Sequence, residues 1–308
     1  MYNSQLRWKP IAFLMLLALI WGGNMGIIKL GIREVAPLFM AGLRSLVASI
    51  CLFIWMKVKR ITIFPSKIVL IHGIVIGFIF GAEFGLIYVG LEYTLTSRVY
   101  VLLYTAPIFA ALGAHFFLKD DRLNPWKVAG LLLAFGGVIA LFAKNLGSFS
   151  FTTLPGDLMA LAAGALWAAT TIYLKKHLAH RTVPLQTLFY QVLFSAPLLF
   201  CMSFVLEEQM VSGFSPVTAF SVFYQCIIVA FLSYLVWFEL IHRYPVSLLH
   251  AFTFLTPLLG VFISGLLIMN EVITANLIGA LILVSFGIIL VNYQPAQKPR
   301  NHAESHSV

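Results

Sequence analysis

Charged side chains are scarce in this sequence. They make up 10% of its 308 residues, whereas apolar side chains make up 61%. An ordinary soluble domain carries about 25% charged residues, because its surface is in contact with water. So few charges cannot cover the surface of a soluble protein of this length. The composition therefore argues against a soluble enzyme.

Paired cysteines and catalytic signatures are also missing. The three cysteines, Cys51, Cys201 and Cys226, stand singly in apolar stretches, so they indicate neither a disulfide framework nor a zinc site. We find no phosphate-binding glycine loop, zinc-protease helix, serine-hydrolase elbow or metal-ligand cluster. We therefore expect no catalytic residue, no metal, no cofactor and no ATP-driven pumping by this chain alone. The net charge of +9 does not indicate nucleic acid, because the basic residues lie in short loops.

What the sequence does contain is a series of long apolar runs. Each is long enough to cross a bilayer, where the backbone must satisfy its own hydrogen bonds as a helix. We expect an all-α membrane protein with ten transmembrane helices, covering residues 11–31, 37–56, 68–91, 98–118, 126–143, 157–174, 184–206, 218–242, 245–269 and 275–293.

Lysine and arginine are distributed unevenly among the loops. With a cytoplasmic N-terminus, 15 of the 20 basic residues lie in cytoplasmic segments and 4 in external loops, and Arg44 lies within a span. Cytoplasmic loops of membrane proteins carry such an excess. We therefore expect both termini to be cytoplasmic.

The second half of the sequence repeats the first at a shift of about 150 residues. Each half contains five spans, so the second half must enter the membrane from the opposite side. We expect two inverted five-helix repeats, at 1–147 and 148–293, and a disordered cytoplasmic tail at 294–308. Such halves can open a central site to either side in turn, which favours a transporter. The corresponding pairs are Trp21 and Trp167, Ser97 and Ser247, Pro107 and Pro257, and Asp121 and Glu271.

Two tracts resemble a known family. The tract from Gly90 to Asp121 contains GLEYTLTSR, TAPIFAAL and DD, and the tract from Leu240 to Glu271 contains LIHRYPVS, LTPLLGV and NE. Both are similar to the repeated tract of the EamA-like transporters in the drug/metabolite transporter superfamily, as are WGGN at 21–24 and AGLR at 41–44. Asp120-Asp121 departs from the Gly-Glu-Arg-like turn of that family, in a loop that we expect to be peripheral.

The resemblance implies a ten-helix carrier in a bacterial inner membrane, with a central cavity between its halves. Members of the family transport amino acids and their derivatives, other metabolites and drugs, and many of them export. The resemblance assigns no substrate-binding residue.

Two charged residues, Arg44 and Glu83, lie well inside predicted spans and away from the span ends. Arg44 and Glu83 are about 10 Å and about 12 Å below the outer surface, at 1.5 Å per helical residue. Because such charges cost about 2.5–3.5 kcal/mol in a bilayer, they are expected to face protein or water. Their matched depth predicts an ion pair, which either couples transport or only fixes helix packing. Glu83 and His72 share a helix face and are candidates to carry protons as the coupling ion; alternatively, His72 reaches the cytoplasmic headgroups.

Other polar and aromatic residues fall near the middle of the predicted spans. Trp21 and Trp167 are expected either to wall a central site for an aromatic or apolar substrate or simply to pack. Asn24 lies one turn beyond Trp21. Pro107 and Pro257 are expected to kink their helices. The remaining cavity candidates are Tyr104, Tyr234 and Thr253.

These observations predict a secondary carrier of small organic metabolites, amino acids or their derivatives first among them, that works by alternating access. It would sit in a lipid bilayer as a monomer or homodimer, with no nucleic-acid partner. Two alternatives remain open: a membrane scaffold or subunit without transport activity, and an intramembrane lipid-modifying enzyme. A solvated cavity lined by Trp21, Glu83 and Trp167 would distinguish the carrier from the scaffold.

Overall fold

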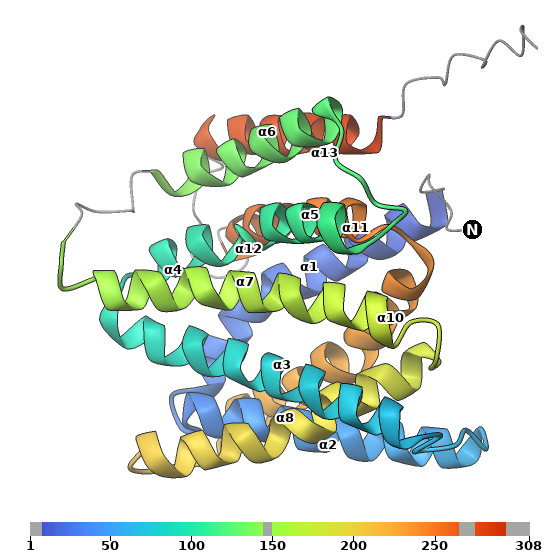
Figure 1. Ribbon diagram of the computed structural model, residues 1–308. Helices are drawn as coiled ribbons and strands as arrows, with labels where there is room; N and C mark the ends of the chain where they lie inside the picture. The colour runs from blue at the N-terminus through green and yellow to red at the C-terminus, as the bar shows by residue number, and fades with distance from the viewer. Residues whose placement is uncertain (1–7, 144–149, 265–274, 294–308) are drawn as a thin grey trace, which may run out of the picture.

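The computed structural model describes residues 8–143, 150–264 and 275–293, and these residues form a bundle of helices joined by short turns. Figure 1 shows the helices running side by side from one end of the bundle to the other. In order they are α1 (Trp8–Gly31), α2 (Pro37–Val58), α3 (Lys67–Tyr93), α4 (Thr96–Leu103), α5 (Ala106–Phe117), α6 (Pro125–Phe142), α7 (Leu154–His177), α8 (Pro184–Leu206), α9 (Pro216–Phe223), the π-helix η2 (Tyr224–Ser233), α10 (Tyr234–Arg243), α11 (Val246–Thr253), α12 (Leu255–Ser264) and α13 (Ala275–Asn292).

The outside of the bundle is apolar, as a bilayer requires. Large apolar side chains such as Phe78, Leu132 and Ile289 are half or more exposed on it. Nine described stretches are long and apolar enough to cross a membrane, with α4–α5, α9–η2–α10 and α11–α12 each forming one stretch. The all-helical membrane fold is thereby confirmed. In the tenth position α13 is apolar over Leu277–Asn292, which is shorter than a full span, so the count of ten stays a prediction.

Proline and capping residues set where many helices begin. A proline occupies the first turn of α2, α6, α7, α8 and α9, where its missing N–H costs no hydrogen bond. The side chains of Ser66, Asn124 and Ser215 accept hydrogen bonds from the first turns of α3, α6 and α9.

A row of glycines lets α3 approach α8 closely. A Cβ atom on any of them would lie within 3.0 Å of an α8 side chain, so the absence of side chains is what permits this packing. The facing pairs are Gly73 and Tyr190, Gly77 and Phe194, Gly81 and Leu198, and Gly85 and Met202.

The helix contacts recur in the two halves of the chain. α1 packs on α12 as α7 packs on α5, and α3 packs on α7 as α1 packs on α9, η2 and α10. Helices α2 and α8 pack on each other, as do α6 and α13. This packing agrees with two related halves; their inverted orientation in a membrane and the boundaries at 147 and 293 stay predictions.

Two crossings are interrupted just before a proline. The α4–α5 crossing breaks at Tyr104 and Thr105, and Pro107 is the second residue of α5. The α11–α12 crossing breaks at Phe254, and Pro257 is the third residue of α12. Proline offers no N–H for the preceding turn, which accounts for both breaks.

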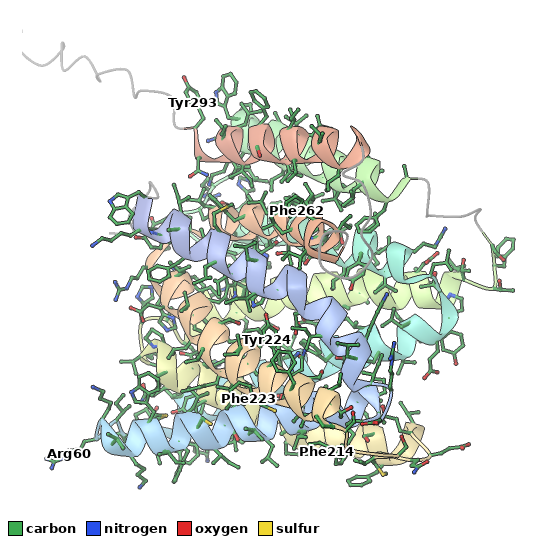
Figure 2. The ribbon with its side chains drawn as sticks, turned by 180° about the vertical axis from the view of Figure 1, so that it is seen from behind. Arg60, Phe214, Phe223, Tyr224, Phe262 and Tyr293 are labelled. Atoms are coloured by element: carbon green, nitrogen blue, oxygen red, sulfur yellow. The ribbon has the colours of Figure 1, made fainter. Side chains whose placement is uncertain are left out.

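The bundle has two ends, which we name by a lysine at each. The Lys29 end holds the last residues of α1 and α3 and the first residues of α7; the Lys175 end holds the last residues of α7 and α10. In Figure 1 the Lys29 end is on the left and the Lys175 end on the right. In Figure 2, seen from behind, Arg60 marks the Lys175 end and Phe214 marks the Lys29 end.

Candidate functional site

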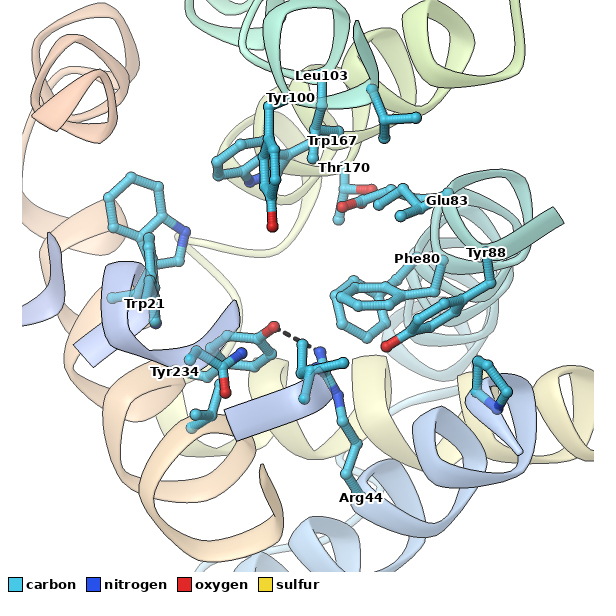
Figure 3. A pocket seen from close by; sticks show the side chains of 18 of the residues that line it. Trp21, Arg44, Phe80, Glu83, Tyr88, Tyr100, Leu103, Trp167, Thr170 and Tyr234 are labelled. Atoms are coloured by element: carbon cyan, nitrogen blue, oxygen red, sulfur yellow. Dashed lines mark hydrogen bonds between the residues drawn. The ribbon is translucent and has the colours of Figure 1, made fainter. Parts of the chain in front are cut away.

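A cavity of about 420 Å³ lies in the middle of the bundle, between α1, α2, α3, α4, α7, α8, η2 and α10. Its wall is mainly aromatic and apolar, with a few polar groups that project into it (Figure 3). Concave sites of this kind are typical for small molecules. Of the residues expected at a central site, seven line it: Trp21, Asn24, Arg44, Glu83, Tyr104, Trp167 and Tyr234.

The two midplane tryptophans both line the cavity. Trp21 on α1 donates from Nε1 to Ser233 Oγ at 2.9 Å and packs edge-on against Trp237, with ring centres 5.4 Å apart. Trp167 on α7 packs edge-on against Tyr104, with ring centres 6.1 Å apart. In Figure 3 both indoles border the open space. They form two apolar walls for a flat or aliphatic group.

The π-helix η2 brings polar groups to the α1 side of the cavity. Gln225 donates from Nε2 to Asn24 Oδ1, and Tyr224 donates to the Ile20 carbonyl at 3.1 Å. A π-helix widens the turn and is frequent at functional sites. Figure 2 shows Tyr224 where this widened segment faces α1. Gln225 was not among the predicted site residues, although an amide inside an apolar run is a usable sequence signal.

Arg44 is held by neutral partners. Its side chain is 2% exposed, donates from Nη2 to the Tyr234 hydroxyl at 2.6 Å, and lies 4.2 Å from the centre of the Phe84 ring. Nη1 reaches Gln225 Oε1 at 3.5 Å. Hydrogen bonds and aromatic faces both suit a delocalised guanidinium. The network fixes a buried positive charge beside the cavity.

The predicted ion pair between Arg44 and Glu83 is not formed in this structure. No nitrogen–oxygen distance of 4.0 Å or less joins them; the ion pairs among the described residues lie elsewhere. Figure 3 shows them on different walls, with Glu83 close to Thr170. The sequence positions of Arg44 and Glu83 set how far along α2 and α3 the two charges lie. The rotation of each helix about its axis decides on which wall of the cavity each side chain lies.

Glu83 has an unsatisfied oxygen in the cavity. It is 5% exposed, and its Oε2 atom has no hydrogen-bond partner among the described residues. Oε1 of Gln191, which also lines the cavity, lacks a partner there too. Buried acceptors without donors are unfavourable. A ligand that carries N–H groups would satisfy both.

Two other predicted residues lie outside the cavity lining. Nδ1 of His72 is 2.7 Å from the Tyr173 hydroxyl, and the His72 ring stacks on His177 with centres 4.8 Å apart. The expected stripe of Glu83 and His72 therefore does not run into the cavity, because α7 covers His72. Thr253 donates to the His250 carbonyl at 2.7 Å within its own helix. Pro107 and Pro257 are likewise outside the lining.

Among the described residues, the cavity lining is exposed at the Lys29 end and buried at the Lys175 end. The lining residues Lys29, Ile32 and Glu92 are exposed, whereas Leu174 and Ile241 at the other end are each 1% exposed. Beside them Lys175, 4% exposed, donates to the main-chain carbonyls of Ile241 and, at 2.9 Å, Tyr244.

A buried aspartate reinforces the closed end. Asp121 is 3% exposed and accepts from the Ser247 main-chain N–H at 2.8 Å, from the Ser247 hydroxyl, and from Lys127 Nζ at 2.7 Å. The expectation that this loop is peripheral was wrong. The carboxylate accepts hydrogen bonds from the first turn of α11, because the free N–H groups at the start of a helix attract negative charge. Its counterpart by the repeat, Glu271, lies outside the described residues.

The profile of the EamA-like transporter family matches the chain twice, over residues 8–143 and 154–293. The chain belongs to the EamA-like transporter family. The resemblance seen in the sequence is confirmed, and the chain is a multi-pass membrane protein of a family whose members are transporters.

Several characterised and uncharacterised relatives support this membership. The uncharacterized transporter YoaV of Bacillus subtilis is 25% identical over 88% of this chain and 92% of its own length. A probable amino-acid metabolite efflux pump of Escherichia coli is 26% identical over 88% of this chain and 91% of its own length. The aromatic amino acid exporter YddG of Ancylobacter novellus is 30% identical over 33% of this chain and 35% of its own length.

One solved crystal structure shares the fold. It superposes with a TM-score of 0.79 over 92% of this chain and 96% of its own chain, at 18% sequence identity. At this identity the likeness concerns the fold alone.

Proposed function

We propose that this EamA-like transporter is a secondary carrier that exports amino acids or their derivatives across a bacterial inner membrane. The observation that carries the proposal is the cavity itself: Arg44 and Glu83 supply opposite charges on different walls of a cavity that the indoles of Trp21 and Trp167 also line. A zwitterion with an apolar side chain complements that arrangement, its carboxylate toward Arg44 and its ammonium toward Glu83. The names of two relatives, an amino-acid metabolite efflux pump and an aromatic amino acid exporter, point the same way.

The proposed transport cycle is alternating access between two inverted five-helix repeats. A cavity that is open at one end of the bundle and closed at the other supports it, as does the double match of the family profile. A scaffold would not need such a cavity. With both termini cytoplasmic, the Lys29 end faces outside. Reporter fusions test this orientation: those after Lys59, Lys175 and Lys298 should be cytoplasmic, and those after Arg33, Lys144 and Glu208 external.

The transport proposal is tested by substrate exchange in proteoliposomes. Vesicles preloaded with pooled amino acids should take up the same radiolabelled compounds in exchange. Arg44→Gln should lower the exchange rate about tenfold or more, because a charged hydrogen bond to the substrate carboxylate is lost. Arg181→Gln, an exposed arginine in the turn after α7, is the control and should leave the rate unchanged. If exchange occurs for no amino acid, or if both variants behave alike, the proposed substrate class is wrong.

Protons are the coupling ion that we propose, with Glu83 as their carrier. A carboxylate with one unpaired oxygen in a cavity that is open to the outside can take up a proton from that side and release it when the cavity opens inward. Glu83→Gln imitates the protonated state, so the variant should still exchange substrate but lose accumulation driven by a pH gradient. If it accumulates substrate as the parent does, Glu83 is not the coupling residue.

A further inference from the structure

A buried lysine ties together the two helices that close the cavity. Lys175 is in the last turn of α7, and its ammonium donates to the carbonyls of Ile241 and Tyr244 at the end of α10. The last carbonyls of a helix have no amide partner within the helix, and they carry the negative end of its dipole. A lysine at this position donates hydrogen bonds to these carbonyls and places a positive charge at the negative end of the dipole. Because Ile241 also lines the cavity, this contact holds its closed end shut.

The sequence places a second lysine at the corresponding point of the first half. Lys29 follows Trp21 by eight residues, just as Lys175 follows Trp167 by eight. The Cα atom of each lysine therefore lies about 12 Å along the helix axis from the Cα atom of the cavity tryptophan on the same helix. Both lysines stand in the last turn of their helices. The family profile matches once over each of these segments, which makes α1 and α7 counterparts.

Lys29 is in a different situation from Lys175. It is exposed, it lines the open end of the cavity, and no hydrogen bond or ion pair joins it to another described residue. At the closed end Lys175 links α7 to α10 by hydrogen bonds, whereas at the open end no hydrogen bond or ion pair among the described residues links α1 to α3.

The repeat also supplies acceptors for Lys29. The shift of 150 that pairs Ser97 with Ser247 places Leu91 and Thr94 where Ile241 and Tyr244 stand. Leu91 is in the last turn of α3 and lines the open end of the cavity, as Ile241 lines the closed end. Free carbonyls at the end of α3 are therefore available on the wall that faces Lys29.

We propose that Lys175 and Lys29 are alternating latches, two gating residues of which one is engaged at a time. In the present state Lys175 holds α10 and Lys29 is released. When the cavity opens at the Lys175 end, Lys29 takes the carbonyls of Leu91 and Thr94 on α3, and Lys175 leaves those of Ile241 and Tyr244. This proposal rests on the proposed alternating access. The two latches determine the equilibrium between the state open at the Lys29 end and the state open at the Lys175 end, and they do not determine which substrate is carried.

Access to each end can be measured without any substrate. In a background with Cys51, Cys201 and Cys226 changed to serine, a single cysteine is introduced either by Leu174→Cys at the closed end or by Ile32→Cys at the open end. A membrane-impermeant maleimide applied from the matching side reports the accessibility of each position. The parent should react at Ile32→Cys and be protected at Leu174→Cys, in line with their exposures of 36% and 1%.

The two latch variants should change accessibility in opposite directions. Lys175→Met should raise labelling of Leu174→Cys about tenfold, because a charged hydrogen bond no longer favours the closed end. Lys29→Met should lower labelling of Leu174→Cys further and leave Ile32→Cys reactive. Lys176→Met, at the exposed neighbour of Lys175, is the matched control and should resemble the parent.

If either lysine had only a structural role, its replacement would lower the yield of folded protein. The two replacements would then not change the labelling of Leu174→Cys in opposite directions. Lys175→Arg keeps donors at the end of α7 and should preserve protection of Leu174→Cys, which keeps the test informative if Lys175→Met folds poorly. Equal changes in both latch variants, or no change in either, overturn the latches. The exchange assay can succeed while this labelling result fails, so the two proposals are tested separately.

Discussion

The Lys175 end and the Lys29 end of the bundle are built from corresponding segments but differ in packing. At the Lys175 end two buried groups bind across helices: Lys175 to the end of α10 and Asp121 to the start of α11. At the Lys29 end the corresponding lysine is exposed. The difference shows that corresponding segments of the two halves make different contacts in the same state of the protein. One end is closed while the other is open, as the proposed alternating access requires.

The largest effect that we expect is at Asp121. Asp121→Asn removes a buried charge that accepts from the start of α11 and from Lys127, so it should lower the free energy of unfolding in detergent by about 3 kcal/mol. Asp120→Asn, at the exposed neighbour, should change it by less than about 0.5 kcal/mol. Thermal unfolding of both variants measures the difference. Equal stability of the two would mean that the closed end does not depend on this carboxylate.

A smaller loss is expected at the Lys29 end. Asp157 accepts from Arg98 Nε at 2.9 Å and from the Thr94 hydroxyl at 2.7 Å, which ties the start of α7 to the end of α3. The side chains of this ion pair are 14% and 10% exposed, so water partly compensates for its loss. Asp157→Asn should destabilise the protein by about 1–2 kcal/mol in the same unfolding assay. A loss larger than that of Asp121→Asn would reverse the ranking of the two ends.

The smallest effect concerns the centre, between the two ends. Arg44 and Glu83 share no ion pair here, so Arg44→Gln and Glu83→Gln should be nearly additive in stability, with a coupling energy under about 0.5 kcal/mol. Unfolding of the two single variants and the double variant completes the cycle. A coupling above about 1 kcal/mol would show that the two charges meet in a state other than the present one.

Much of this architecture follows from the sequence. The apolar runs specify helices because a bilayer leaves the backbone no other partners, and the glycine row of α3 permits the close contact that α8 makes. Trp21 and Trp167 could be selected because tryptophan is unusual near a membrane midplane. The resemblance of the two repeated tracts was enough to identify the family, because it is carried by residues close together in the sequence and needs no tertiary contact.

The site itself depends on contacts between residues far apart in the chain. Gln225 meets Asn24 and Arg44 only because η2 packs on α1 and α2. Lys175 counts as an ordinary loop-flanking lysine in the sequence, yet it is buried against the end of α10.

The sequence by itself determined how far along its helix each charged residue lies, because that distance follows from the rise of a helix along the chain. Only the tertiary structure decided what each one meets, since that depends on how every helix is rotated about its axis and which end of the bundle is closed. Arg44 therefore binds Tyr234 instead of Glu83, and Lys175 is engaged while Lys29 is not.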